Sequence, residues 1–313
     1  MTGEGPLLLA GGGHSHALVL KRWAMHPQHR PRGEVVLINR HGTALYSGMV
    51  PGLIAGTYGH DDVAIDLRHL CDRAGVAFVA AEIEGIDPAK QVLKLRSRPP
   101  LRYGLLSLNV GAISRPTAAG VPIKPLETAL EFLRQQDDQS DVPFRVIGAG
   151  AAGLEVVLAL RCRWPERPLL LQAHPNQLEH DQQRALKRAA IDLVTAANAT
   201  DGPSLLCSGS QAPGWLKASG LPVDPDGRVL TDACLQIGGH PGLFASGDCA
   251  VIRDQPRPPS GVWAVRAALP LARNLEAACL GKPPQAWRPQ KQALQLLGDA
   301  TRQPPQAWAR RGR

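Results

Sequence analysis

Two glycine-rich stretches carry the clearest chemical signal in this sequence of 313 residues. The second stretch reads VIGAGAAGLE, in which Gly148, Gly150 and Gly153 follow the spacing G-x-G-x-x-G directly after an apolar run. In such a turn the first glycine permits a tight bend, the second lets a diphosphate approach the backbone, and the third lets a helix pack closely on the strand. The amides at the helix start then face the diphosphate. This stretch predicts a dinucleotide site.

The first glycine-rich stretch, LLLAGGGHSHALVL, spans residues 7–20 and matches the motif less well. Gly11 and Gly13 take the first two glycine positions, but His16 stands where the third glycine is expected. We expect His16 to widen the spacing between helix and strand, and His14 to be able to approach a phosphate oxygen. Both can equally be ordinary polar residues at a helix start, so this stretch by itself does not distinguish a nucleotide site from a glycine-rich turn.

The residues expected to bind a nucleotide ribose are not acidic. An Asp or Glu is typical about 20 residues after the glycines, but Gln172 ends the strand after the second turn and Asn39 ends the strand after the first. Glutamine can bond a hydroxyl and does not repel a 2′-phosphate, so NADH and NADPH both stay open. Arg163 and Arg167 lean slightly towards the phosphate.

Each glycine stretch lies inside a pattern that predicts a buried parallel sheet, because its strands are apolar without polar alternation. The first copy predicts strands at 7–10 and 34–39 around a helix at 14–25, and the second predicts a strand, turn and helix over 143–164 and a strand over 167–173. The intervening and later elements are expected as follows: a connection over 46–59, a helix over 62–75, a strand-like stretch over 76–87, two strands around a Pro-Pro turn over 91–111, a short strand within 239–252, a helix over 261–281, and poor order from 285 onward.

Charge and cysteine content exclude several other classes of protein. The formal net charge is +8, but the basic residues are dispersed except at 310–313 and no nucleic-acid-binding signature is present, so no nucleic-acid partner is expected. The six cysteines include no C-x-x-C pair, which argues against a disulfide scaffold, a zinc ribbon and a dithiol redox centre, and no metal site is expected. Without a signal peptide or an apolar run of about 18 residues, the expected location is cytoplasmic.

The motifs in their order resemble the two-dinucleotide-domain flavoproteins, the pyridine nucleotide-disulfide oxidoreductase superfamily, and within it the type II NADH dehydrogenase-like proteins. The branch of these that is fused to selenophosphate synthase in some bacteria carries GGGHSH and YSGMVPG, both present here, and LFASGDCA adds the family's Gly-Asp pair. The resemblance spans residues 7 to about 298 with gaps. It implies an α/β fold class with two Rossmann-like FAD/NAD(P)-binding domains, the second inserted in the first and shortened.

The same resemblance implies FAD as cofactor, NAD(P)H as substrate and a set of cofactor-binding residues, while no catalytic side chain is assigned. By this resemblance, the first glycine turn is expected to cradle the FAD diphosphate and Asp248 to bind the ribityl chain. YSGMVPG is expected beside the flavin, and the helix near Gly261 at the pyrimidine edge of the flavin. The expected binding residues are Gly11, Gly12, Gly13, His14, Ser15, Asn39, Tyr46, Ser47, Gly48, Met49, Pro51, Gly111, Gly148, Gly150, Gly153, Gln172, Gly247, Asp248 and Ala264.

The expected FAD-binding domain takes residues 1–117 and 238–313, and the NAD(P)-binding domain takes 118–237. Only one helix and one strand fit between Gln172 and Ser208, which is fewer than the family's second domain holds. The sequence therefore predicts an oxidoreductase that passes hydride from NAD(P)H through flavin to a quinone or other small-molecule electron acceptor.

Two alternatives stay open at this point. One is a non-catalytic or truncated FAD-binding module linked to selenium metabolism, with selenophosphate synthase as partner. The other is a peripheral protein at the inner face of the membrane, held by the basic charge and by residues 302–313.

Overall fold

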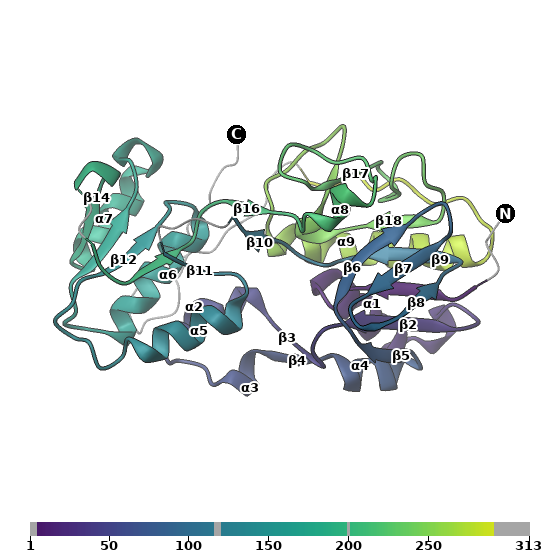
Figure 1. The fold of residues 1–313 in the computed structure, drawn as a ribbon, viewed down its shortest axis with the longest axis horizontal. Coiled ribbons are helices and arrows are strands. Elements are labelled where there is room, and N and C mark those ends of the chain that lie inside the picture. Colours follow the sequence, from purple (N-terminus) through teal and green to yellow (C-terminus); the bar gives the residue numbers. More distant parts are fainter. Residues whose placement is uncertain (1–4, 116–119, 199–200, 291–313) are drawn as a thin grey trace. The chain divides into compact units, whose positions relative to one another are not determined.

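The structure is a computed structural model that describes residues 5–115, 120–198 and 201–290, and it divides the chain into two compact units (Figure 1). Among the described residues, unit 1 holds 5–46, 64–112 and 211–290, and unit 2 holds 47–63, 113–115, 120–198 and 201–210. The units thus differ from the expected domains in three places, because 47–63 and 113–115 group with unit 2 and 211–237 group with unit 1. The basic tail lies within 291–313, outside the described residues.

Unit 1 is built on a five-stranded, all-parallel sheet in the order β18-β9-β1-β2-β5. The strands are β1 (Leu7–Ala10), β2 (Val35–Asn39), β5 (Ala77–Ala80), β9 (Leu105–Leu108) and β18 (Leu243–Ala245). Because all five run in one direction, their carboxyl ends meet at one edge, where ligands bind in open α/β sheets. The turns after β1, β9 and β18 therefore share that edge.

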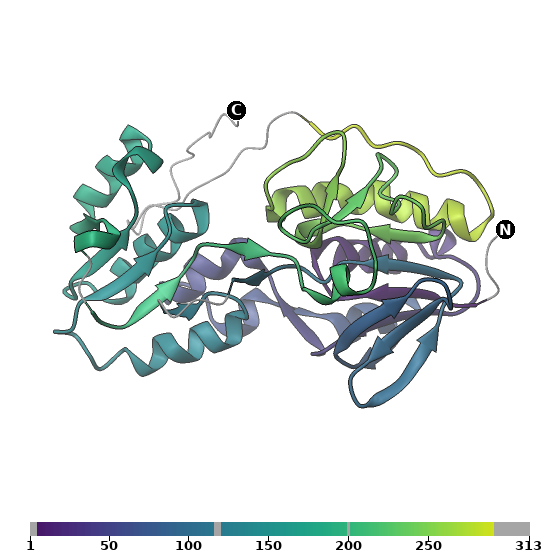
Figure 2. The same cartoon turned by 45° about the horizontal axis from the view of Figure 1, so that its top comes forward.

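Alternate residues of the sheet face two different layers. Leu7 and Leu9 pack against the helices α1 (His14–Met25), α4 (Leu67–Ala74) and α9 (Gly261–Cys279), whereas Leu8 and Ala10 face the other layer. That second layer is an antiparallel sheet of β6 (Ile83–Asp87), β7 (Val92–Leu95) and β8 (Arg98–Arg102). Figure 2 shows α9 running along one face of unit 1. The buried, unalternating strands of the sequence are explained by these two apolar faces.

Shorter elements complete unit 1. They are β3 (Thr43–Leu45) paired with β4 (Ala64–Asp66), β17 (Val229–Thr231) paired with β19 (Ala250–Ile252), α8 (Trp215–Ala218), and the 3₁₀ turns η1 (Pro27–His29) and η5 (Gly247–Cys249). Part of β16 (Ser210–Gln211) also belongs to this unit.

Unit 2 repeats the parallel architecture with the order β11-β15-β12-β13-β14. The strands of this sheet are β11 (Val121–Pro122), β12 (Phe144–Ile147), β13 (Leu169–Gln172), β14 (Ile191–Val194) and β15 (Ser204–Leu206). Unit 2 also contains the short strand β10 (Ile113–Ser114), which is not part of the sheet. Its helices and 3₁₀ turns are α2 (Val50–Ile54), α3 (His60–Val63), α5 (Leu126–Gln135), α6 (Ala151–Arg163), α7 (His180–Arg188), η2 (Ser47–Met49), η3 (Pro175–Gln177) and η4 (Ala196–Asn198). One helix and one strand, α7 and β14, fill the short interval after β13 as predicted.

Three local predictions were wrong. The Pro99–Pro100 pair lies inside β8 instead of in a turn, which an edge strand tolerates because it needs fewer backbone donors. Poor order was expected from 285 onward, yet in the described stretch 285–290 the amide of Trp287 donates to the backbone oxygen of Ala233 over 2.8 Å and its ring packs against the core of unit 1. The single helix expected over 62–75 is interrupted, because Asp66 caps a new helix by accepting from the amide of His69 over 2.9 Å.

Candidate functional site

The first glycine turn follows β1 and packs against the end of β9. Gly11 has a φ of +92°, and an added Cβ would lie 2.5 Å from the backbone oxygen of Asn109. A Cβ on Gly13 would lie 2.3 Å from Oδ1 of the same asparagine. Side chains are therefore excluded at both positions, by the backbone conformation at Gly11 and by close approach at Gly13.

The backbone amides of this turn are partly used inside the protein. The Gly12 amide donates to Oδ1 of Asn39 over 2.9 Å, and the Gly13 amide donates to the backbone oxygen of Asn109 over 3.1 Å. The side-chain nitrogen of Asn39 donates to the backbone oxygen of His41 over 2.8 Å. Asn39, expected at a ribose, thus has both polar side-chain atoms engaged in holding the turn.

The helices after the two glycine turns start in nearly the same way. Gly13 caps α1 with φ −65° and ψ 171°, and Gly150 caps α6 with φ −66° and ψ 170°. Within the described chain, neither cap has a side-chain hydrogen bond and neither first turn holds an acidic residue. Such a helix start favours an anion. A Cβ on Gly150 would meet no described atom within 4 Å, which leaves room for a diphosphate.

Asn109 joins the first glycine turn to the Gly-Asp pair. Its side-chain nitrogen donates to the backbone oxygen of Ser246 over 2.7 Å, and its Oδ1 accepts from the amide of His16 over 3.3 Å. Gly247 has a φ of +72°, and a Cβ there would lie 2.5 Å from that side-chain nitrogen. The structure therefore brings the turn carrying Asp248 to the same edge as the first glycine turn.

The start of α9 is fastened to the start of α1. The buried hydroxyl of Ser15 donates to the backbone oxygen of Ala264 over 2.7 Å. A Cβ on Gly247 would lie 3.6 Å from the Cβ of Ala264, so this residue also borders the Gly-Asp turn. Three expected site residues, Ser15, Gly247 and Ala264, are thus neighbours, although the hydroxyl of Ser15 is used to hold the helices together.

The stretch YSGMVPG is divided between the two units. Tyr46 belongs to unit 1 and contacts His14 edge-on, with ring centroids 5.3 Å apart and planes at 66°. The remaining expected residues of this stretch lie on η2 and α2 of unit 2, namely Ser47, Gly48, Met49 and Pro51. Gly111, beyond β9, has a φ of +69°, which explains a glycine there.

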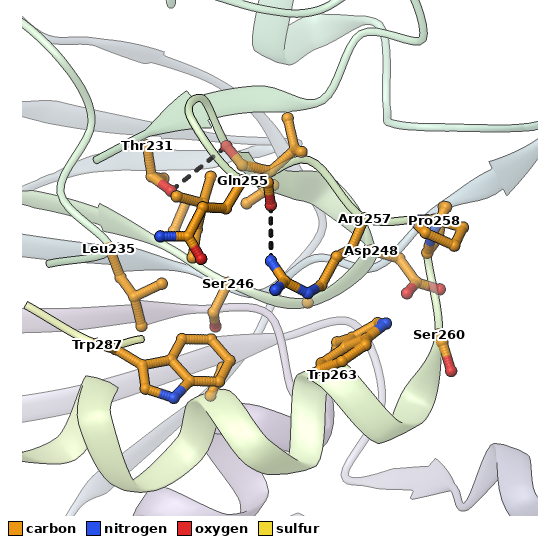
Figure 3. A pocket seen from close by; sticks show the side chains of 17 residues that line it. Thr231, Leu235, Ser246, Asp248, Gln255, Arg257, Pro258, Ser260, Trp263 and Trp287 are labelled. Atoms are coloured by element: carbon orange, nitrogen blue, oxygen red, sulfur yellow. Dashed lines mark hydrogen bonds between the residues drawn. The ribbon is translucent and has the colours of Figure 1, made fainter. Parts of the chain in front are cut away.

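A cavity of about 60 Å³ lies behind the Gly-Asp turn, between η5, β17, β19 and α9 (Figure 3). The guanidinium of Arg257 lies over the ring of Trp263, 5.0 Å from its centroid, and Trp287 forms another wall. The buried hydroxyl of Ser246 lines the cavity and has no hydrogen-bond partner among the described residues. A space of this size holds a few water molecules.

The second glycine turn has the strand–turn–helix form that its sequence predicts. Gly148 has a φ of +121° and its amide donates to the backbone oxygen of Gln172 over 3.1 Å, which places Gln172 beside the turn. A Cβ on Gly153 would lie only 1.9 Å from the backbone oxygen of Gly148. The third glycine of this motif is therefore required by close packing of helix on strand.

Arg163 and Arg167 do not support a preference for NADPH. Arg163 pairs with Asp137 at the far end of α6. Arg167 is buried ahead of β13, where it donates to the backbone oxygens of Gln136 and Val142 over 2.8 and 2.7 Å. Both arginines lie away from the carboxyl ends of the strands, so the slight indication of 2′-phosphate binding was wrong.

Comparison with known proteins agrees with this geometry. No family model matches the chain. The chain is 24% identical to a demethylphylloquinone reductase of Synechocystis sp., in a match covering 85% of this chain and 78% of that protein. The NADH:rubredoxin oxidoreductase of Clostridium acetobutylicum superposes with a TM-score of 0.75 and 16% identity, over 93% of this chain and 79% of that one.

A third match is the reduced CoADR-RHD of Bacillus anthracis, with a TM-score of 0.76 and 16% identity over 91% of this chain. The match spans 58% of that solved chain, less than two thirds of its length. The fold is that of these oxidoreductases. It is a mixed α/β fold with two parallel-strand units, as the sequence predicts.

Sequence reasoning missed Asn109 and Glu155, and it gave His16 only a role in spacing the helix from the strand. Asn109 was overlooked because it takes no glycine position of a nucleotide-binding motif. Glu155 follows the second glycine motif on α6, and burial raises its pKa to about 7, which is suitable for a group that gives or takes a proton near neutrality. A strongly apolar helix with one acid is the signal that could have identified Glu155.

The two cysteines nearest the glycine turns, Cys249 and Cys207, are unsuited to redox chemistry at neutral pH. Cys249, next to Asp248, is buried, and desolvation raises its pKa to about 11. Burial raises the pKa of Cys207, near the second glycine turn, to about 12. Thiols with such values stay protonated and unreactive. The described residues contain no group of three or more metal-binding side chains.

Proposed function

We propose that this protein is a FAD-dependent oxidoreductase that takes hydride from NAD(P)H and passes the electrons to a quinone or another small acceptor. The observation that carries the proposal is the pair of matching helix starts, one of which is joined through Asn109 to the Gly-Asp turn. The names of the similar proteins support it, since one is a demethylphylloquinone reductase and another an NADH:rubredoxin oxidoreductase.

We assign FAD to unit 1 and NAD(P)H to unit 2. When bound, FAD would supply the hydride acceptor and electron carrier. In unit 1, the start of α1 would hold the diphosphate and Asp248 would hold the ribityl hydroxyls. In unit 2, the start of α6 would hold the second diphosphate, with room left by Gly150. Gln172, beside that turn, would bond the ribose without repelling a 2′-phosphate.

Two finer expectations, a selenophosphate synthase partner and membrane contact, come from the sequence. A selenophosphate synthase partner rests on the shared GGGHSH and YSGMVPG stretches alone. Membrane contact rests on residues 302–313, outside the described part of the chain. In the described ranges, no helix is both long enough and apolar enough to cross a membrane.

The absorbance spectrum of the purified protein tests the proposal. Flavin bands that bleach on anaerobic addition of NADH or NADPH, and return on addition of a soluble quinone, are expected. Comparison of the two nicotinamides at equal concentration decides between them. Colourless protein that cannot be reconstituted with FAD would contradict the whole assignment. Yellow protein that neither nicotinamide bleaches would contradict the catalytic part.

A further inference from the structure

The two glycine turns differ at their sixth position, where unit 2 has Gly153 and unit 1 has His16. In unit 2 even a methyl group would collide with the backbone oxygen of Gly148, 1.9 Å away. Unit 1 accommodates a whole imidazole at the corresponding place, with no exposed surface. A bridge through a side chain has therefore replaced direct packing of helix on strand.

Both ring nitrogens of His16 have partners. Nδ1 lies 2.6 Å from the backbone oxygen of Gly11, and Nε2 lies 2.8 Å from the hydroxyl of Ser107 on β9. A carbonyl oxygen only accepts, so Nδ1 carries the proton, and Nε2 accepts from the Ser107 hydroxyl. Burial lowers the pKa of His16 to about 4, so the ring is neutral at physiological pH.

These contacts fix one peptide group of the turn from both sides. The backbone oxygen held by His16 and the Gly12 amide held by Asn39 belong to the same peptide, between Gly11 and Gly12. With both ends bonded, this peptide cannot rotate to turn its carbonyl oxygen towards an anion at the start of α1. A carbonyl oxygen in that direction would repel a diphosphate.

We propose that His16 is a positioning residue for the FAD diphosphate, which acts by donating from Nδ1 to the Gly11 carbonyl and so locks the first glycine turn. The proposal rests on the proposed function, because it takes FAD to be the ligand of unit 1. His16 does not touch the cofactor in this role. Its effect is on FAD affinity through the orientation of the turn.

Two amide variants separate the two hydrogen bonds. In His16→Asn the side-chain nitrogen can replace Nδ1 and keep the Gly11 bond, whereas His16→Gln reaches the Nε2 position and keeps only the Ser107 bond. We expect His16→Asn to bind FAD within about threefold of the natural protein, and His16→Gln and His16→Gly to bind at least tenfold more weakly. Asn274→Ala is the control, because Asn274 is another buried hydrogen-bonded residue of unit 1, bonded to Cys234 and Gln285.

The measurements are FAD titration by fluorescence quenching and ¹⁵N NMR of the His16 ring in the natural protein. The expected spectrum shows a neutral ring with its proton on Nδ1. A proton on Nε2, or binding by His16→Gln as tight as by His16→Asn, would overturn the inference even if His16→Gly fails to fold. Failure of the natural protein to bind FAD would contradict the proposed function instead, whatever tautomer the spectrum shows.

Discussion

The side-chain nitrogen of Asn109 donates to the backbone oxygen of Ser246 over 2.7 Å, although 137 positions separate the two residues in the chain. Through its Oδ1 the same side chain also accepts from the amide of His16. One buried asparagine at the end of β9 therefore connects the glycine turn after β1 with the Gly-Asp turn after β18. Both ends of the site assigned to FAD depend on it.

Replacing Asn109 by Ala should weaken FAD binding and destabilise unit 1. The change removes the Asn109 partner of the His16 amide and leaves the Ser246 carbonyl without its amide donor, although the thiol of Cys249 still donates to that oxygen over 3.3 Å. A buried group left without its partner costs about 1–3 kcal/mol. Asn109→Asp should do at least as much damage, since it turns the donor towards Ser246 into an acceptor. Urea unfolding and FAD titration measure both effects. Natural-like FAD affinity in both variants would show that the connection is dispensable.

Substitutions in the second glycine turn should separate nicotinamide binding from FAD binding. Gly153→Ala places a methyl group 1.9 Å from the Gly148 oxygen, so unit 2 must distort, and nicotinamide-dependent bleaching should be lost while the flavin bands remain. Gly150→Ala meets open space and should fold normally, yet raise the KM for NAD(P)H by intruding on the ligand. Stopped-flow absorbance at the flavin bands checks both variants. Loss of FAD from either would contradict the assignment of unit 2 to the nicotinamide.

Acid should destabilise unit 1 partly through His16. Its pKa is lowered from 6.5 to about 4 by burial, so between these values the unfolded chain binds a proton that the folded chain does not. The free energy of unfolding therefore falls as pH drops from about 6.5 to about 4, by about 3 kcal/mol from this residue. In His16→Asn this part of the pH slope should vanish, measured by urea unfolding at a series of pH values. Identical slopes in both proteins would mean that His16 is not buried as a neutral ring.

Glu155 should give the opposite pH dependence in unit 2. Burial raises its pKa from 4.5 to about 7, so between these values the unfolded chain has lost a proton that the folded chain keeps. Stability therefore falls as pH rises through this range. Glu155→Gln should remove that slope and stabilise unit 2 by about 1–3 kcal/mol at pH 8. Thermal unfolding of both proteins at pH 5 and pH 8 is the measurement, and a variant without gain at pH 8 would contradict the raised pKa.

Much of the local structure follows from short stretches of sequence. Uninterrupted apolar runs indicate buried strands, and glycines at fixed spacing indicate turns in which side chains do not fit, so both strand–turn–helix units could be predicted from residues 7–25 and 143–164. Two of the local predictions that failed, at the Pro-Pro strand and at the cap of α4, concern a proline-containing or polar stretch that is compatible with two local conformations.

The order of the strand–turn–helix motifs along the chain also indicated a duplicated parallel fold. Only the tertiary structure decided which side chains meet at the carboxyl edge of each parallel sheet. Ser107 lies 91 positions from His16, and Asn109 lies farther still from Ser246. Arg167, close to a predicted site in sequence, is buried at the opposite end of its strand. Periodicity and glycine spacing act over a few residues, whereas such contacts depend on strand order and direction, which bring distant parts of the chain to one edge of the sheet.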